Sequence, residues 1–441
     1  MPILQRELLL PIRSKWYTAS DKHNDVAHYT MLSITKGGKA VEKYSVYRYR
    51  WVVLIIYMYV AALTQLYWLN FAAIDTYLEE NLNISAMSVG VLTLVFPLVQ
   101  VLLTIPAGLV IDRKGFKYGV GIGALFTGIF AMLRLVNPGS YAVLLVSQIG
   151  ISIGQPFVLN GITKLALTWF PQKEEATAVG LGSLALLIGM MIALGATPIL
   201  VETLGFQSML LLYAILGIVG ALLFYILAKP KPQTPPREME EEEEISNWGG
   251  IKRILKMRDF VILGFIALIG IGVFNGLATW LEKILNELHQ ISMTDAGTIA
   301  AILILSGMLG CIIIPLVSDR MRRRKPFLLL ASSMGAVSLV YLMLAKGFAL
   351  NMVNGIILGF FLISALPIML TMSAEITGPW FAGISVGYLQ LLGNAAAVAI
   401  VPIMEVMRGA TEGYIMPLAF LAALMGIAFV LATRIKETAR S

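Results

Sequence analysis

Long runs of apolar residues, separated by short polar segments, fill most of the chain after residue 50. Each run has at least the ~20 residues that an α-helix needs to cross the hydrocarbon of a bilayer. Spanning β-strands would instead read as alternating segments of ~10 residues. We therefore predict an all-α membrane protein with twelve spanning helices, at 51–75, 86–111, 117–136, 141–168, 176–201, 206–228, 259–283, 292–318, 326–346, 348–374, 380–404 and 413–433.

A weak internal repeat divides these helices into two halves of six. The segment GLVIDRKGFK at 108–117 returns as PLVSDRMRRRK at 315–325, an offset of 207 residues. RWVVL at 50–54 resembles DFVIL at 259–263 at an offset of 209, and YLE at 77–79 is echoed by WLE at 280–282. Similar spacing at several places indicates a duplicated chain.

The repeat organises the chain into five parts. Residues 1–50 are polar and basic and predict a cytoplasmic, mostly disordered tail, with Met31 as a second candidate for the translation start besides Met1. The two six-helix halves occupy 51–228 and 259–433, and 434–441 form a cytoplasmic C-terminal tail. The linker at 229–258 carries the acidic run Glu238–Glu244, which predicts a solvated tether. It ends on an apolar and basic stretch that predicts a short helix on the inner membrane surface.

Composition and charge narrow the class of protein further. Hydrophobic residues make up 58% of the chain and charged residues 13%, a balance too apolar for a soluble protein. The net charge of +7 does not indicate nucleic-acid binding, because lysine and arginine gather in loops on one side of the predicted bundle. Cytoplasmic loops carry such an excess, so we place both termini in the cytoplasm and the protein in the cell membrane.

The sequence offers no catalytic or metal-binding constellation. Cys311 is the single cysteine, and the three histidines are scattered along the chain. We therefore predict no disulfide, metal site or cofactor. Enzyme activity is not expected, since no pairing of a nucleophile with a base is apparent. The predicted partners are the lipid bilayer and a small-molecule substrate, and we expect a monomer.

The junction at 108–117 has a spacing of glycines and charges that a plain basic loop does not explain. Gly108 permits the close approach of a neighbouring helix, and Asp112 can face a helix N-terminus or an arginine. The pattern G-x-x-x-D-R-x-G-x-K, between the second and third of twelve helices, resembles the signature loop of the major facilitator superfamily. The resemblance implies that Gly108, Asp112, Arg113 and Gly115 belong to a lock on the cytoplasmic gate.

The second copy of this junction departs from the pattern. It keeps Asp319 and Arg320 but has Pro315 where the first copy has its glycine. The resemblance therefore implies a gating role for Asp319 and Arg320 as well, and the proline predicts that this second lock is looser than the first.

Polar side chains within the spans indicate where a substrate binds. Such groups are costly in lipid and usually face a bundle interior or a cavity. Predicted helices 1, 4, 7 and 11 carry Gln65, Trp68, Asn70, Gln148, Gln155, Asn160, Asn275, Gln390 and Asn394. In transporters built from repeats, binding sites lie where the halves meet. We select Trp68, Gln155, Asn275, Gln390 and Asn394 as substrate-binding residues, because amides bond weakly charged groups and an indole offers its face to a cation.

Each of these residues has an alternative interpretation. Trp68 lies in the outer third of its helix and is also suited to an interfacial aromatic belt. Gln155 precedes Pro156 and can satisfy backbone groups that the proline frees. The three remaining amides can bond neighbouring helices. Their coincidence on helices related by the repeat favours the pocket.

Asp75, near the outer end of the first helix, is interpreted as a solvated helix end rather than a site for a cation or a proton. No acidic residue lies at the middle of a predicted span. The proton relay of a strongly proton-driven carrier is therefore not visible in the sequence, which favours facilitated diffusion.

Within the superfamily, scattered segments of residues 48–405 resemble the feline leukaemia virus subgroup C receptor family of haem and choline transporters. They are RW at 50–51 through Trp68, GQPFVLN at 154–160, TWFP at 168–171 and EIT at 375–377. The resemblance implies that Trp68 and Gln155 line a pocket for a quaternary ammonium or amine head group. It also implies that Gln390 and Asn394 stand where the family has the two amides exchanged.

One departure from that family concerns the substrate. Asn275 follows Phe274 at a position where the family has a tyrosine. Without the tyrosine, the aromatic cage that the resemblance implies lacks one wall. This departure disfavours choline itself as the substrate and favours a more polar amine.

We therefore predict a transporter of a small organic solute, an amine or organic cation such as choline or ethanolamine, that works by alternating access. Haem or another porphyrin is an alternative cargo, although no histidine lies in a predicted span to bind its iron. A non-transporting receptor or sensor on a carrier fold is a second alternative, favoured only by the acidic linker and the basic tail.

Overall fold

The described residues of a computed structural model are 15–20, 27–34, 40–236, 247–378 and 381–438. Within them, twelve helical segments are long and apolar enough to span a membrane, as the hydropathy pattern predicted. The first half contains α1 (Tyr49–Leu69), α3 (Ala86–Lys114), α4 (Phe116–Leu133), α5 (Tyr141–Leu159) continued by α6 (Gly161–Trp169), α7 (Gln172–Leu204) and α8 (Phe206–Leu227). The second half contains α10 (Arg258–His289), α11 (Met293–Met321), α12 (Lys325–Leu344), α13 (Phe348–Thr377), α14 (Ala382–Thr411) and α15 (Ile415–Arg434). The predicted all-α membrane fold is confirmed.

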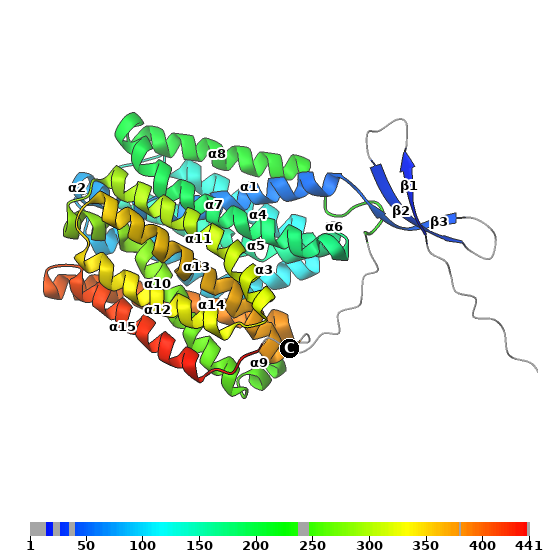
Figure 1. Cartoon of the computed structure of the whole chain (residues 1–441). Helices are drawn as coiled ribbons and strands as arrows, with labels where there is room; N and C mark the ends of the chain where they lie inside the picture. Colours follow the sequence, from blue (N-terminus) through cyan, green and yellow to red (C-terminus); the bar gives the residue numbers. More distant parts are fainter. Residues whose placement is uncertain (1–14, 21–26, 35–39, 237–246, 379–380, 439–441) are drawn as a thin grey trace, which may run out of the picture.

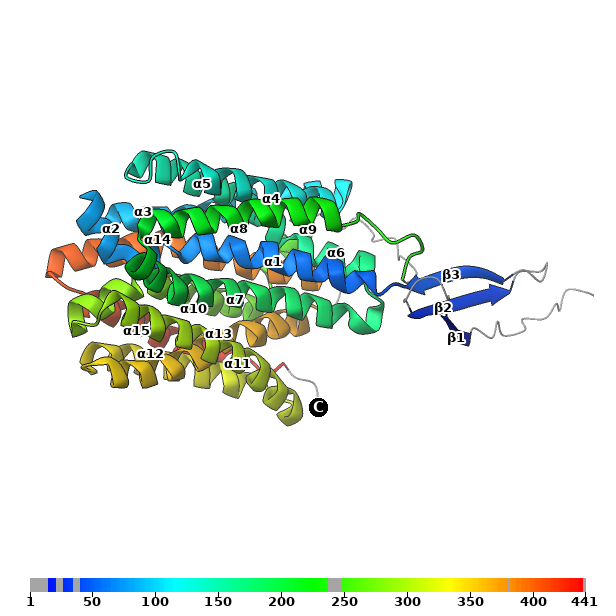
Figure 2. The ribbon, with the colours of Figure 1, turned by 90° about the horizontal axis from the view of Figure 1, so that it is seen from above.

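The helices form one elongated bundle with two distinct ends. Figure 1 shows a small β-sheet and the C-terminus at one end, which we call the terminal end. The short helix α2 (Asp75–Leu82) lies at the other, which we call the opposite end. Figure 2 shows the same bundle turned by 90°, with the sheet again beyond the terminal end.

The segment expected to be a disordered tail contains strands. β1 (Lys15–Ser20), β2 (Ala27–Ile34) and β3 (Ala40–Val46) form an antiparallel sheet in the order β1-β2-β3. Their sequences, KWYTAS, AHYTMLSI and AVEKYSV, are rich in the aromatic and β-branched residues that suit strands. For these described stretches the expectation of disorder was wrong, because it averaged polarity over fifty residues.

The start of the linker packs against this sheet instead of hanging free as a tether. The backbone N–H of Ser45 donates to the Pro235 carbonyl at 3.1 Å. The Tyr47 hydroxyl and the Thr234 Oγ1 lie 3.2 Å apart. The predicted short helix near the end of the linker is present as α9 (Asn247–Ile254). The acidic run Glu238–Glu244 lies outside the described residues.

Two of the predicted spans are interrupted. The first helix ends at Leu69, and the chain continues through a single 3-10 turn (Ala72–Ile74, η1) into α2. The fourth span breaks at Asn160, between α5 and α6. Pro156 lies one turn before this break and removes a backbone donor from α5. Both interruptions place polar side chains at the interface between the halves.

The halves are packed together toward the opposite end. Across them, α7 packs on α11 and α3 packs on α14. A Cβ atom added at Gly297 of α11 would lie 2.6 Å from the Leu194 carbonyl of α7. One at Gly90 of α3 would lie 2.5 Å from the Trp280 ring of α10. These glycines allow the helices of the two halves to approach closely.

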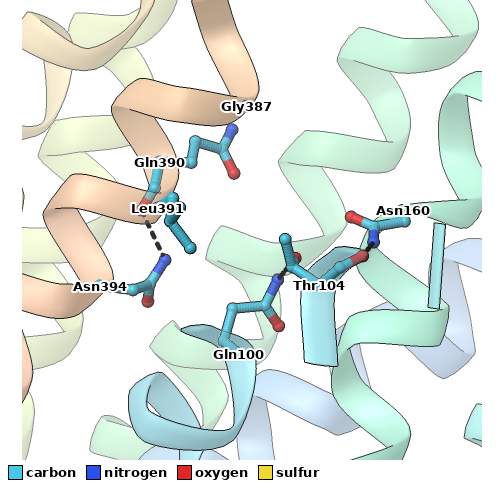
Figure 3. Close-up of a pocket in the computed structure, with 7 residues that line it drawn as sticks. All are labelled: Gln100, Thr104, Asn160, Gly387, Gln390, Leu391 and Asn394. Carbon is cyan, nitrogen blue, oxygen red and sulfur yellow. Dashed lines mark hydrogen bonds between the residues drawn. The ribbon is translucent and has the colours of Figure 1, made fainter. Parts of the chain in front are cut away.

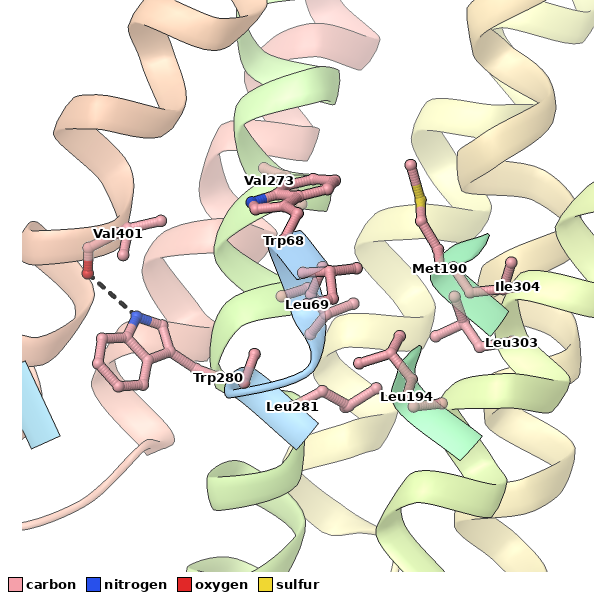
Figure 4. Close-up of a cluster of buried hydrophobic side chains, with 14 of the residues drawn as sticks. Trp68, Leu69, Met190, Leu194, Val273, Trp280, Leu281, Leu303, Ile304 and Val401 are labelled. Carbon is pink, nitrogen blue, oxygen red and sulfur yellow. Dashed lines mark hydrogen bonds between the residues drawn. The ribbon is translucent and has the colours of Figure 1, made fainter. Parts of the chain in front are cut away.

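The buried apolar side chains show the same asymmetry between the two ends. One cluster joins residues of both halves, and Figure 4 shows Trp68, Leu194 and Leu303 within it. A second cluster contains only residues of the first half, among them Tyr57, Phe116 and others toward the terminal end. The core is therefore continuous across the halves at the opposite end, and a separate core belongs to the first half at the terminal end.

Candidate functional site

A polar cavity lies between the two halves. Its volume is about 70 Å³, and its lining residues come from α3, the α5–α6 break and α14: Gln100, Thr104, Asn160, Gly387, Gln390, Leu391 and Asn394. Figure 3 shows the side chains of α3 facing those of α14 across it. None of these lining residues is charged or aromatic, so the cavity offers amides and a hydroxyl to whatever enters it.

Three of the four amide groups that line the cavity donate one hydrogen bond each. Gln100 Nε2 donates to Thr104 Oγ1 at 2.8 Å, and Asn160 Nδ2 donates to the Thr104 carbonyl at 2.8 Å. Asn394 Nδ2 donates to the Gln390 carbonyl at 2.9 Å (Figure 3). The buried Gln100 Oε1 has no partner among the described residues. Amide oxygens such as Gln100 Oε1 can accept hydrogen bonds from a ligand.

The structure brings together only two of the five residues predicted to bind substrate. Gln390 and Asn394 line the cavity, four positions apart on α14. Three polar residues that were not selected line it with them: Gln100, Thr104 and Asn160. Asn160 had been noted as a polar residue in a span. The same argument applied to Gln100, four residues before Thr104 on α3, would have found it.

Trp68, Gln155 and Asn275 are not lining residues of this cavity. The Trp68 ring is buried in the apolar cluster of Figure 4 rather than placed in a surface belt, and its Nε1 has no partner among the described residues. Gln155 is buried, and its side chain makes no hydrogen bond within the described part of the chain. Asn275 Nδ2 donates to the Ile271 carbonyl at 2.8 Å, while its Oδ1 is unpartnered.

The first of the two repeated junctions contacts α8 through Lys117, whose Nζ donates to the Tyr225 carbonyl at 3.4 Å. Gly115 ends α3 with a φ of +85°, a conformation that favours glycine. Asp112 and Arg113 are exposed and form no ion pair with other described residues. A Cβ at Gly108 would lie 3.9 Å from Asn160 Nδ2, an ordinary contact, so no helix approaches this glycine closely here.

The second junction is held by charges, although Pro315 predicted the looser lock. Arg324 forms ion pairs with Asp319 and with Glu375 of α13, the latter at 3.2 Å. Thr438, beyond α15, donates to Glu375 at 2.6 Å. Arg320 is exposed. Pro315 lies inside α11, and these contacts tie the end of that helix to α13 within the second half.

Charged side chains join the halves at the opposite end. Lys283 of α10 forms an ion pair with Glu79 of α2. Glu282 accepts hydrogen bonds from the Thr76 backbone N–H and from the Thr76 hydroxyl, both at 3.2 Å. These contacts cross from one half to the other. Asp75 is 1% exposed beside them, so its interpretation as a solvated helix end was wrong.

Twelve spanning helices in two repeated halves, with a polar cavity between the halves, define a membrane transporter. The chain belongs to the Major Facilitator Superfamily, whose family model matches residues 53–402. The superfamily predicted from the junction at 108–117 is therefore confirmed.

Individual proteins of this superfamily are similar to the chain over most of its length. The chain is 26% identical over 379 residues to an uncharacterized MFS-type transporter of Caenorhabditis elegans (C09D4.1), covering 82% of this chain and 65% of that relative's length. It is 24% identical over 380 residues to the human choline/ethanolamine transporter FLVCR2, covering 81% of this chain and 72% of the relative. The predicted relation to the feline leukaemia virus subgroup C receptor family is confirmed.

A solved structure has the same fold. The chain resembles a bacterial homolog of the human lysosomal transporter Spinster, determined in an inward-facing and unoccupied conformation, with a TM-score of 0.71. The match covers 88% of this chain and 98% of that structure at 15% sequence identity. The likeness is one of fold.

Proposed function

We propose that this transporter carries a small organic amine, and that it prefers a primary amine such as ethanolamine to choline. Relatives named as choline/ethanolamine transporters support the class of substrate. The observation that carries the preference is the lining of the cavity by amide side chains, among them Gln100 with its unpartnered Oε1.

The preference follows from the chemistry of the two head groups. A primary ammonium has three N–H donors, and amide oxygens such as Gln100 Oε1 accept from them. A quaternary ammonium has no N–H and is recognised mainly by aromatic faces. The described lining residues of the cavity include no aromatic side chain.

We propose that transport occurs by rocking of the two halves around this cavity. The lysine and arginine distribution supports a cytoplasmic terminal end. The contacts that join the halves gather at the opposite end, through Lys283 and Glu79 among others. Asp112 of the first junction is unpaired among the described residues, as expected of a cytoplasmic lock that is released. The conformation is thus one closed to the outside.

A porphyrin is a poorer candidate cargo than an amine. The cavity of about 70 Å³ is well below the ~300 Å³ at which pockets for drug-sized ligands begin. Its amide lining also lacks the extended apolar walls that a macrocycle requires. No contact in the described residues favours a receptor without transport.

Ligand stabilisation tests the proposed substrate. A ligand that binds the folded state raises its stability, by ~2.7 kcal/mol at a hundredfold excess over its dissociation constant. We expect ethanolamine to raise the melting temperature of the purified protein more than choline does at equal concentration. The exposed-amide variant Gln172→Leu should respond as the wild type does. A larger shift with choline, or none with either amine, would contradict the proposal.

A further inference from the structure

The segments that the internal repeat relates to each other meet at the opposite end. YLE at 77–79 lies on α2 and WLE at 280–282 on α10, and the contacts Glu79–Lys283 and Thr76–Glu282 join these two segments. The contact between the halves at this end, which we call the seam, therefore carries charged groups, whereas the lining of the cavity between the halves carries none. Among these groups, two carboxylates differ from the rest.

Asp75 and Glu282 are buried acids with unpartnered oxygens. Asp75 is 1% exposed, and neither of its carboxylate oxygens has a hydrogen-bond partner among the described residues. Glu282 is 4% exposed, and its Oε1 is likewise unpartnered although its Oε2 accepts from Thr76. A buried carboxylate without partners is costly when ionised and gains a proton instead.

The nearby cations already have carboxylate partners. The charged and titratable groups of this region are Asp75, Glu79 and Glu80 on α2, Glu282, Lys283 and Glu287 on α10, Glu405 and Arg408 on α14, and Tyr414 before α15. Lys283 is paired with Glu79, and Arg408 is paired with both Glu287 and Glu405. The described seam therefore has fewer cations than carboxylates.

Burial has the largest effect on the pKa of Asp75, and the neighbouring charges act on it in both directions. Asp75 lies between α1 and α3, outside the spanning segments. Its burial raises the pKa of its carboxyl well above the ordinary value, and the charges of Glu282 and Glu405 raise it further. Lys283 and Arg408 lower this pKa but do not offset the burial.

We propose that Asp75, together with Glu282, forms a proton-binding site that is occupied when the opposite end is closed and releases its proton when the halves part there. Among the described residues, no group of three metal-ligating side chains is present, which favours a proton over a metal ion. The site makes opening of this end dependent on pH. This inference rests on the alternating access proposed above, but it does not depend on the identity of the substrate.

The direction of the pH dependence follows from linkage. In the closed state the pKa of Asp75 is raised, and in the open state water returns it toward ~3.9. The closed state therefore binds the proton more tightly and loses its advantage as the pH rises through the raised pKa. For one proton, the ratio of open to closed molecules grows by up to about tenfold per pH unit between the open-state pKa and the raised pKa, and it levels off above the raised pKa.

Distances between spin labels at the opposite end test the proposal without any substrate. Labels are attached to cysteines replacing the exposed Ser208 on α8 and Ala349 on α13, in a Cys311→Ala background. We expect the population with the longer distance to increase from acidic to alkaline pH in this otherwise unchanged protein. Asp75→Asn mimics the protonated acid and should keep the short distance at every pH.

Two further variants make the outcome specific. Glu282→Gln removes a charge that raises the pKa of Asp75, so the transition should move to lower pH. Glu202→Gln removes an exposed carboxylate at the same end and should leave the transition unchanged. A pH-dependent distance that persists in Asp75→Asn, an absence of pH dependence in the parent, or opening controlled by Na⁺ instead of pH would overturn the proposal. Because no substrate is used, this result is independent of the ethanolamine test.

Discussion

Replacing Gln390 and Asn394 together by leucine is expected to lower the rate of ethanolamine uptake at least tenfold. Both amides line the inter-half cavity from α14. Leucine is similar in size but has no oxygen to accept from an ammonium group. Each hydrogen bond to a charged group contributes about 1.5–3 kcal/mol, and ~1.4 kcal/mol corresponds to a factor of ten. Loss of these hydrogen bonds should therefore lower the rate of transport more than it lowers the stability of the fold.

The fold should tolerate this double variant. Gln390 is exposed, and the Asn394 side chain bonds only the Gln390 carbonyl of its own helix. The matched control is Gln172→Leu with Gln207→Leu, which changes two exposed amides away from the cavity. Initial rates in proteoliposomes, at equal incorporation and with melting temperatures recorded, compare the two. Uptake by Gln390→Leu/Asn394→Leu at the rate of the control would show that the cavity is not the substrate site.

Replacing Lys283 by methionine should shift the protein strongly toward the state open at the opposite end. Lys283 is 3% exposed and forms an ion pair with Glu79 across the halves. Methionine keeps an unbranched apolar stem but leaves Asp75, Glu79 and Glu282 without this cation. Removing one partner of a buried ion pair costs about 3–5 kcal/mol. The ratio of open to closed molecules should increase by a factor of about 100 or more.

The spin labels at Ser208 and Ala349 measure this shift directly. Lys346→Met, which removes an exposed cation at the same end of the second half, is the control and should leave the distance unchanged. Adding Glu79→Met to Lys283→Met removes the unpaired carboxylate too and should restore part of the closed population. If Lys283→Met retains the short distance of the parent, the ion pair does not hold this end closed.

The spanning helices could be predicted from the sequence because a helix that crosses the bilayer must be long and apolar. Both properties can be read from one continuous run of residues, without knowledge of its contacts. The break after Leu69 was missed for the same reason, since Ala72–Ile74 continues the apolar run without forming a continuous helix. The strand Lys15–Ser20 was missed because its pairing with β2 gives no signal in a hydropathy average.

The site was harder to predict because it depends on contacts between distant residues. Gln390 and Asn394 followed from their polarity, but Trp68 satisfied the same rule and lies in the buried apolar cluster. Polarity within a span shows that a residue faces protein, not whether it faces a cavity. The burial of Asp75 depends on α10, about two hundred positions away, although the repeat had already paired 77–79 with 280–282.

Counterflow in proteoliposomes tests the central claim of a carrier for small primary amines most directly. Vesicles containing the purified protein and preloaded with unlabelled ethanolamine are placed in a trace of labelled ethanolamine. We expect saturable accumulation of the label that external unlabelled ethanolamine abolishes and that choline reduces less at equal concentration. Accumulation no greater than in protein-free vesicles, from protein that remains folded and monodisperse, would contradict the account.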